Sequence, residues 1–547
     1  MERNNTISIP SGEETSPPEE KKLVFPKIPI PLLCVFLLLL AVIVWFCFYA
    51  THTKGITGSD DREYVSIARN IVNGQGIVKD SILPLEVNFF KQLPIPEFMH
   101  PPGYPLIIAG FFKLFGVSDF VALLPSYLAY FILILLVFYF VKKYVNTKTA
   151  IMATIILIFN KEILNYSSIA LSEEVYTAVF FLFFILIIRA NSLGAIFFSG
   201  VILGVSHLIR ENIYPFFIPM LFFLYFYPDL LRWKKMGLFI IGLLIPISFI
   251  ISRNYLMTGE PFFSYGKFAF MAFSDKYPWL NIYRDIHNPS LIEFILTEPS
   301  QFLLKYLKNL MSALEQIMRF SNPYLLAFFL LDMFHWKINP ELKKIKILFL
   351  LLLISQILFI SLFTITDRYF IPFLPLMILF ASQCFLRVSE NVISLSMNTW
   401  EKSLRWIFAF LFLIFFVVPT TYLIIQPRII PQFGYLVSQD EARKLNEFLT
   451  KELNKNQIVW TDLPEILEWE GNRLSGWIPT SVAKIYEINK KIPVDAILLT
   501  NIRTPYRMEA EWQYLLFREQ SLPNYRTVKL YKGDIIFAKL FIRDDKK

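Results

Sequence analysis

The sequence predicts a polytopic α-helical membrane protein with about eleven spans, interfacial helices in the first external loop and a small soluble α/β domain at its C-terminal end. The first observation is composition: of 547 residues, 55% are hydrophobic, 17% aromatic and only 18% charged. A soluble protein could not bury that much apolar surface. The second is a series of apolar runs up to residue 425, separated by clusters of Lys and Arg. The third is a change, from residue 426 onward, to the composition of a soluble domain.

Composition also excludes several classes of function. The net charge of +9 is modest for this length and lies largely in clusters between spans, where it sets membrane orientation, so it does not indicate a nucleic-acid partner. The three cysteines, Cys34, Cys47 and Cys384, lie inside apolar runs, which argues against a disulfide framework or a thiolate metal site. The chain carries no P-loop or dinucleotide fingerprint, so we expect no nucleotide cofactor.

The transmembrane part begins after a polar cytoplasmic tail, residues 1–28. The apolar run that follows is too long for the core of a signal peptide and lacks a small-residue cleavage site, so we expect a first span there. Within residues 29–425 the predicted spans are 29–50, 120–141, 149–160, 174–188, 195–208, 213–229, 236–252, 322–336, 345–364, 370–386 and 406–425.

Charge decides the status of one shorter apolar stretch, residues 104–116, because about 13 residues cannot cross a core of about 30 Å. If this stretch lies in the interface, the basic clusters at 142–143, 232–235 and 343–346 all face the cytoplasm, as the positive-inside rule requires. The external side then holds the first loop 51–119, the loop 161–173, the long loop 253–321 and everything from 426 onward.

Residues 426–547 suffice for an α/β domain with its own core. Buried strands are predicted by QIVWTD at 457–462 and VDAILLT at 494–500, and helices are predicted at 442–453 and 481–489. A hairpin turning at Gly533 and Asp534 is predicted by VKLYKGDIIFAKL.

The most informative stretch directly follows the first span. Asp60 and Asp61 open a segment in which Tyr64, Ile67 and Ile71 recur at helical spacing, which predicts an amphipathic helix on the membrane surface. Two carboxylates so close to a bilayer are costly unless a ligand, a metal or chemistry uses them. One interpretation is a general base for an incoming hydroxyl group. The other is capping of the helix N-terminus.

Further candidates lie on the same predicted face of the membrane. A lipid-linked phosphate needs cations there, and Arg210, Arg253 and Arg368 lie at external span ends, where they are either phosphate ligands or snorkelling anchors. Glu173 and Glu174 lie where the loop 161–173 ends and a helix begins, so a helix-dipole role is the alternative for one of them.

The order of these motifs resembles that of a known family. DDREYVSIAR at 60–69 followed by HPPGYP at 100–105 resembles the first external loop of the GT-C glycosyltransferases that use lipid-phosphate sugars. The nearest pattern is that of the aminoarabinose transferases of lipid A and the bacterial protein O-mannosyltransferases. Residues 253–263, 366–376 and 461–479 are similar to later segments of that family, and the resemblance covers most of the chain.

The resemblance implies roles for individual residues. Asp60 matches the family's catalytic base, Tyr64 the aromatic residue beside it, and Glu173 a second carboxylate that orients a substrate hydroxyl or holds Mg²⁺ or Mn²⁺ together with Asp60. His100 stands where the aminoarabinose transferases have a Lys next to Pro-Pro, so a fixed positive charge is not expected there at neutral pH. The alternative for His100 is a turn residue bonded to the backbone.

The expected function is transfer of a sugar from a polyprenyl-phosphate carrier to a lipid, protein or glycan acceptor, by inverting single displacement on the external face of the plasma (inner) membrane. Asp60 and Asp61 are the catalytic candidates, and the donor site would contain Arg368, Arg253, Arg210, His100 and Tyr64. The alternative is a transporter or flippase of lipid-linked glycans, which would place its ionisable residues at mid-membrane. A glycan polymerase that uses lipid carriers would not explain the C-terminal domain.

Overall fold

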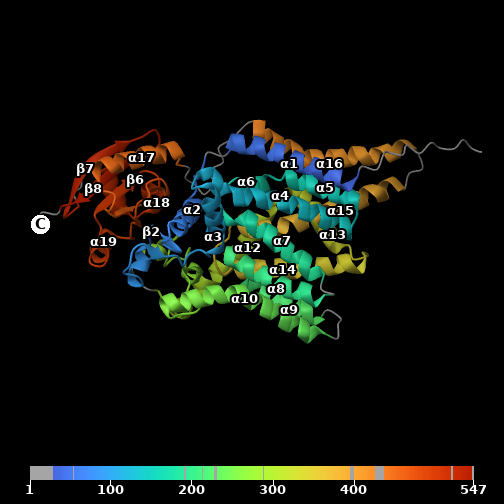
Figure 1. Cartoon of the computed structure of the whole chain (residues 1–547), viewed down its shortest axis with the longest axis horizontal. Coiled ribbons are helices and arrows are strands. Elements are labelled where there is room, and N and C mark those ends of the chain that lie inside the picture. Colours follow the sequence, from blue (N-terminus) through green and yellow to red (C-terminus); the bar gives the residue numbers. More distant parts are fainter. Residues whose placement is uncertain are drawn as a thin grey trace, which may run out of the picture.

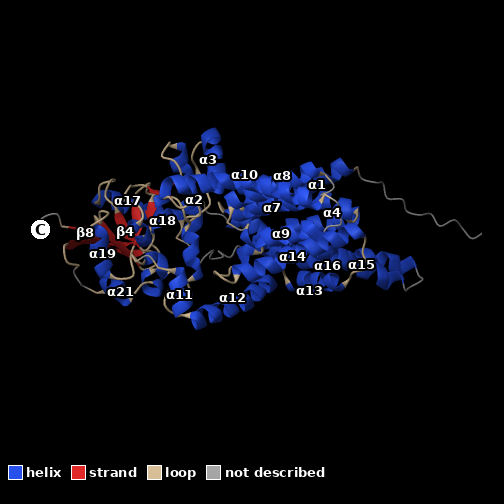
Figure 2. Ribbon diagram, turned by 90° about the horizontal axis from the view of Figure 1, so that it is seen from below, coloured by secondary structure: helices blue, strands red, loops and turns tan. Residues whose placement is uncertain are grey.

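The structure, a computed structural model, combines a helical bundle with a sheet-containing unit at one end (Figure 1). The residues it describes are 29–52, 55–189, 192–211, 213–226, 231–287, 289–394, 399–425, 437–518 and 522–544. The strands gather at the C-terminal end of the molecule, and helices make up the rest (Figure 2).

Each predicted span corresponds to one helix of the bundle. These helices are α1 (Ile30–His52), α4 (Asp119–Tyr144), α5 (Thr147–Ile158), α7 (Ser172–Ile188), α8 (Leu193–Ile209), α9 (Tyr214–Phe226), α10 (Arg232–Thr258), α13 (Pro323–Phe334), α14 (Pro340–Ile360), α15 (Leu374–Ser394) and α16 (Thr399–Ile425). Short or interfacial helices connect them: α2 (Ser59–Val72), α3 (Gly103–Phe115), α6 (Lys161–Ser167), α11 (Leu291–Thr297) and α12 (Pro299–Phe320).

The lengths of these helices support fewer spans than the sequence predicts. Within the described ranges, five helices are long and apolar enough to cross a membrane, and the bent pair α6–α7 makes six if it is one span. At 1.5 Å per residue, a helix of 12 residues such as α5 or α13 covers only about 18 Å of a core of about 30 Å. The chain is therefore multi-pass, while the count of eleven stays a prediction.

The helices of the bundle pack closely where small residues allow it. Gly200 and Gly204 on α8 face α10, and a side chain at Gly200 would collide with the carbonyl oxygen of Phe239. Gly242 on α10 meets the carbonyl oxygen of Phe197 in the same way. Small residues four apart let two helices approach within backbone contact, as is common in membranes. This contact fixes α8, whose C-terminal end carries Arg210.

The sheet unit contains six strands in the order β2-β5-β4-β6-β8-β7. Their bounds are β2 (Ser81–Ile82), β4 (Val459–Thr461), β5 (Ser475–Trp477), β6 (Ala496–Thr500), β7 (Tyr525–Lys532) and β8 (Phe537–Arg543). The first four strands in that order pair in parallel, and β8 pairs antiparallel with both β6 and β7. The predicted strands correspond to β4 and β6, and the predicted hairpin corresponds to β7 and β8.

One strand of this sheet comes from the predicted external loop 51–119, and this pairing was not predicted from the sequence. β2 pairs with β5, and the loop adds a two-stranded ladder of β1 (Val78–Lys79) and β3 (Ile95–Pro96). The remaining helices of the unit are α17 (Gln439–Glu452), α18 (Pro464–Trp469), α19 (Val482–Asn489), α20 (Thr504–Arg507) and α21 (Ala510–Phe517). Residues from 437 onward therefore complete their sheet with a strand of the membrane-proximal loop.

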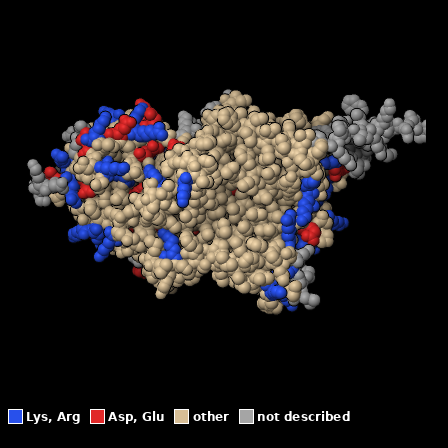
Figure 3. Space-filling view, viewed as in Figure 1, with Lys and Arg blue, Asp and Glu red and all other residues tan. Residues whose placement is uncertain are grey.

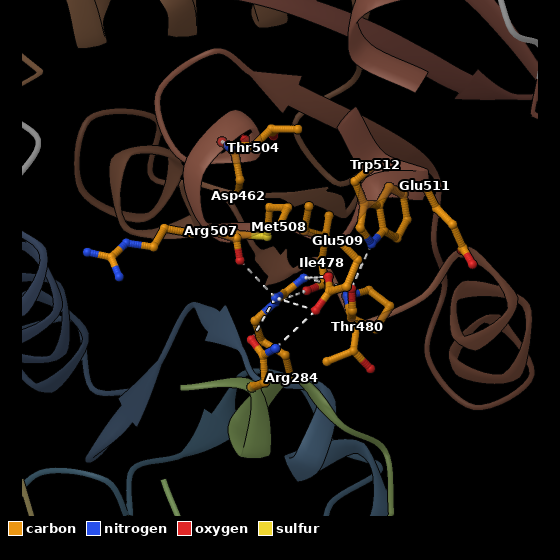
Figure 4. Close-up of polar contacts among 12 residues, drawn as sticks. Arg284, Asp462, Ile478, Thr480, Thr504, Arg507, Met508, Glu509, Glu511 and Trp512 are labelled. Atoms are coloured by element: carbon orange, nitrogen blue, oxygen red, sulfur yellow. Dashed lines mark hydrogen bonds and ion pairs between the residues drawn. The ribbon is translucent and has the colours of Figure 1, made fainter. Parts of the chain in front are cut away.

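The long loop 253–321, also predicted to be external, packs into the sheet unit as well. One apolar core unites Leu85 of the first loop, Tyr265 of the long loop and Trp460 of β4. Arg284 ends the short helix η3 (Asn281–Arg284) of the long loop and is completely buried. Its guanidinium group donates to the carbonyl oxygens of Ile478 and Pro479, both at 2.9 Å, and lies 2.7 Å from a carboxylate oxygen of Glu509 (Figure 4).

The surface divides along the long axis of the molecule. Lys, Arg, Asp and Glu side chains gather over the sheet unit at one end, and mainly Lys and Arg gather at the other, with an uncharged belt between them (Figure 3). An uncharged belt of this kind is what the hydrocarbon core of a bilayer requires.

Candidate functional site

The two adjacent carboxylates at the start of α2 have different surroundings. The carboxylate of Asp61 is 3% exposed and accepts the backbone N–H groups of Gly58 at 3.0 Å and Arg62 at 2.8 Å. It thus caps the helix from its third position. The Asp60 side chain is 33% exposed and makes no such contact with its own helix among the described contacts. The capping role therefore belongs to Asp61, and Asp60 is the carboxylate open to a substrate.

Asp60 belongs to a row of alternating charges drawn from four segments. Its Oδ2 atom lies 2.6 Å from Nη1 of Arg368, in the short helix η4 (Asp367–Tyr369). The same Arg368 nitrogen lies 3.6 Å from Glu173 on α7, and that carboxylate is 2.5 Å from Nη1 of Arg210. The ring of Tyr369 stacks with Arg210 at 4.9 Å. The structure thus brings together four of the predicted site residues.

The ion pair controls the charge of Asp60. Burial raises the pKa of this carboxyl, but Arg368 and, to a smaller extent, His100 outweigh burial and lower the pKa to about 2. Asp60 is thus an ionised carboxylate at neutral pH. For Asp61 burial dominates and raises the pKa, although Arg62 and the backbone N–H groups oppose it.

The aromatic and histidine candidates lie beside this row. The Tyr64 ring packs edge-on against His100 at 4.9 Å and against Tyr104 at 5.2 Å. Nδ1 of His100 lies 3.5 Å from Glu63 and 3.8 Å from Glu97. Burial lowers the pKa of His100, although Glu97 and Asp60 oppose it. The turn therefore fixes His100 among carboxylates, so it does not supply the fixed cation that a Lys would.

Arg253 and Glu174, the two other predicted candidates, make no described contact with this row of charges. Arg253 on α10 donates to the carbonyl oxygen of Glu97 at 2.7 Å and lies over the ring of Phe98 at 4.5 Å, so it holds the loop that carries His100. Glu174 is fully buried in α7, and neither of its carboxylate oxygens has a hydrogen-bond partner among the described residues. Arg253 as a donor-site residue and Glu174 as a second carboxylate stay predictions.

Several residues near the site were not predicted from the sequence to be site residues. Glu63 lies one helical turn after Asp60, a spacing that could have indicated a shared face. Tyr166, in the predicted external loop 161–173, lies with its hydroxyl 3.4 Å from Asp367. Lys79 and Glu86 form a completely buried ion pair of 2.8 Å in the first loop, and nothing in the pattern of that loop signals it.

The fit of a divalent metal can be judged from the carboxylates. Asp60 and Glu173, the predicted ligand pair, both contact Arg368, which lies where a cation between them would lie. Among the residues that the structure describes, no group of three His, Cys, Asp or Glu side chains could hold a metal ion. These residues do not fit a Mg²⁺ or Mn²⁺ site.

Comparisons with known proteins identify the class. Residues 99–253 match the family model described as dolichyl-phosphate-mannose-protein mannosyltransferase. The structure is similar to ArnT from Cupriavidus metallidurans in the apo state, with a TM-score of 0.55 at 11% identity over 93% of this chain and 98% of that one. The same enzyme bound to undecaprenyl phosphate gives a TM-score of 0.53 at 11% identity, over 94% and 98% of the two chains.

A third similar structure is the archaeal oligosaccharyltransferase AglB from Archaeoglobus fulgidus, in complex with an inhibitory peptide and a dolichol-phosphate. Its TM-score is 0.51 at 11% identity, over 92% of this chain and 74% of that one. No curated protein sequence matches the chain. The fold is that of a multi-pass membrane protein of the GT-C glycosyltransferase class. The resemblance predicted from the sequence, to GT-C glycosyltransferases that use polyprenyl-phosphate sugars, is confirmed.

Proposed function

We propose that the protein transfers a sugar from a polyprenyl-phosphate carrier to a hydroxyl or amine of an acceptor on the external face of the membrane. The observation that carries this proposal is the pair of Asp60 and Arg368: an ionised, partly exposed carboxylate 2.6 Å from a guanidinium group. The carboxylate suits a base, and the guanidinium suits a phosphate leaving group. The family match and the GT-C fold support a lipid-linked donor.

The proposed reaction is a single displacement that inverts the configuration of the anomeric carbon. Asp60 accepts the proton of the acceptor group while the acceptor oxygen or nitrogen forms a bond to the anomeric carbon. The bond from that carbon to the phosphate oxygen breaks, and the carrier leaves as the polyprenyl phosphate. Arg368 and Arg210 neutralise the charge that develops on the phosphate, and Glu173 positions both arginines.

The location of the site argues against the transporter alternative. Asp60 lies at the start of α2, shortly after α1 ends at His52, and Arg368 precedes α15. These groups therefore lie at helix ends beside the sheet unit, whereas a transporter would place its ionisable groups near the midplane.

The cationic part of the site is tested with Arg368→Gln. The variant loses charge-assisted hydrogen bonds worth roughly 1.5–3 kcal/mol, so we expect the Michaelis constant for the donor to rise by about tenfold or more. Because the guanidinium also holds down the pKa of Asp60, the acid limb of the rate profile should move to higher pH. The measurement is transfer from a polyprenyl-phosphate sugar in detergent, as a function of donor concentration and pH.

Two further variants complete this test. Arg319 is exposed on α12 and pairs only with Glu315 one turn away among the described contacts, so Arg319→Gln should behave like the wild type. Arg253→Gln should raise the donor Michaelis constant less than Arg368→Gln, because Arg253 holds Glu97 and Phe98. An unchanged donor constant and pH profile in Arg368→Gln would show that this arginine is a membrane anchor.

The external placement of the site is tested by topology. Reporters fused after Lys143 or Lys235 should report the cytoplasm, and one after Lys547 should report the external side, because the basic clusters orient the spans. The measurement is paired alkaline-phosphatase and fluorescent-protein activity in cells. A cytoplasmic reporter signal at Lys547 would place the sheet unit and Asp60 on the wrong side for this reaction.

A further inference from the structure

A cavity of about 290 Å³ lies at the end of the bundle remote from Asp60. Its wall is formed by the end of α4, the link between α13 and α14, and the side of α15, with Tyr144, Lys337, Asn339, Gln383 and Arg387 among its residues. α4 begins at Asp119, which accepts the indole N–H of Trp469 in the sheet unit. Its 26 residues then place Tyr144 about 39 Å away, so this cavity is separate from the proposed active site.

A cluster with an excess of positive charge lies next to the cavity and reaches it through Arg387. Asp332 is completely buried, and its two carboxylate oxygens lie 2.8 Å from Nζ of Lys346 and 2.5 Å from Nη2 of Arg387. Two cations and one carboxylate leave a net charge of +1, which the carbonyl oxygens of Asp332 and His335 that accept from Nζ of Lys346 offset only in part. Lys346 is itself fully buried, whereas Arg387 is 24% exposed and lines the cavity. Arg387 therefore carries the charge that a ligand would meet.

The rest of the wall offers cations and hydrogen-bond donors but no acid. Lys337 is exposed at the rim, and the amide of Gln383 lines the wall. None of the described residues that line the cavity is Asp or Glu. The two nearby acids in α14 and α15 are engaged elsewhere, since Glu341 pairs with Lys344 and Glu390 with Lys148. A phosphate group matches this set of charges and donors.

The rim also indicates where the ligand comes from. Phe334, the last residue of α13, is 82% exposed, and Trp336 is 45% exposed next to Lys337 of the cavity wall. Exposed aromatic side chains next to cations are typical of the level of lipid headgroups. Figure 3 shows Lys and Arg side chains gathered at this end, at the border of the uncharged belt. A phosphate at this height belongs most naturally to a lipid.

We propose that this cavity binds the phosphate of an anionic phospholipid in the leaflet opposite the active site. Arg387 and Lys337 hold the phosphate oxygens, Gln383 donates to them, and the acyl chains lie along the exposed face near Phe334. The bound headgroup balances the excess positive charge of the cluster of Asp332, Lys346 and Arg387, so the lipid stabilises the contact between α13, α14 and α15.

The test uses the full-length protein in a neutral detergent and follows thermal unfolding. Adding phosphatidylglycerol should raise the unfolding temperature in a saturable way, and phosphatidylcholine should not. Lys337→Gln should weaken the apparent affinity for phosphatidylglycerol by about tenfold, the loss expected for one charge-assisted contact. Gln383→Leu should weaken it less. Both positions are at least partly exposed, so we expect both variants to fold.

Lys148→Gln is the matched control, because Lys148 is exposed on the same end but does not line the cavity. An equal loss of affinity in Lys148→Gln and Lys337→Gln would show a diffuse surface effect and overturn the proposal. So would an equal response to phosphatidylglycerol and phosphatidylcholine. If inorganic phosphate alone stabilises the wild type but not Lys337→Gln, the site is a phosphate site and its lipid source is refuted.

Discussion

Replacing Asp60 by Asn is expected to lower the rate of sugar transfer by about 10²-fold or more while leaving folding and membrane insertion intact. Asn has the same size and can still accept the hydrogen bond from Arg368, so the local geometry survives. It cannot accept a proton from the acceptor, because the amide is not basic. The measurement is turnover of a polyprenyl-phosphate sugar at saturating donor, normalised to the amount of folded protein.

Asp61→Asn is the internal control for this prediction. Asp61 caps α2 through the N–H groups of Gly58 and Arg62, and Asn retains one acceptor oxygen for that role. We expect a loss of roughly 0.5–1 kcal/mol in stability and transfer within a few-fold of the wild type. If transfer persists in Asp60→Asn and disappears in Asp61→Asn, the base is the other carboxylate.

The second large effect is expected at Arg284. Arg284→Met removes the cation from a buried cluster and takes the guanidinium donor away from the carbonyl oxygen of Ile478 (Figure 4). Glu509 loses its ion pair and keeps the Asn281 amide as a donor, and the carbonyl oxygen of Pro479 keeps only the indole N–H of Trp512. Breaking such a pair on one side costs roughly 3 kcal/mol of unfolding free energy. The measurement is denaturant unfolding in detergent, followed by tryptophan fluorescence, because Trp512 is buried beside this cluster and donates to Pro479.

Arg526→Met provides the comparison, because Arg526 is exposed on β7 and should tolerate the change. In Arg284→Met we expect the loop 253–321 to detach from the sheet unit before the bundle unfolds. Equal unfolding free energies for Arg284→Met and the wild type would mean that the apolar core alone holds the loop in place.

The sequence permits prediction of elements whose pattern is local. The amphipathic spacing after Asp60 corresponds to α2, and the apolar runs correspond to the helices of the bundle. The convergence of Asp60, Glu173, Arg210 and Arg368 could also be predicted, since the charge clusters place all four at one face. Knowing that residues share a face of the membrane does not reveal which of them are in contact. The order of the ion pairs therefore became visible only in the structure.

What could not be predicted depends on contacts between distant segments. β2 has only two residues, Ser81 and Ile82, and so shows no alternation that would reveal its pairing with β5. The buried pair of Lys79 and Glu86 looks like an ordinary exposed loop sequence. The different roles of Asp60 and Asp61 likewise could not be predicted. They depend on which of the two carboxylates accepts the backbone N–H of Gly58.

The most direct test of the central claim, that Asp60 serves as the base in transfer from a lipid-phosphate sugar, is mass spectrometry of the glycolipids and glycoproteins of cells lacking the gene. At least one glycosylated species should disappear on deletion, return with the wild-type protein and stay absent with Asp60→Asn expressed at the same level. Full restoration by Asp60→Asn would contradict the role of this carboxylate. Identical glycolipid and glycoprotein profiles with and without the gene would contradict the glycosyltransferase itself.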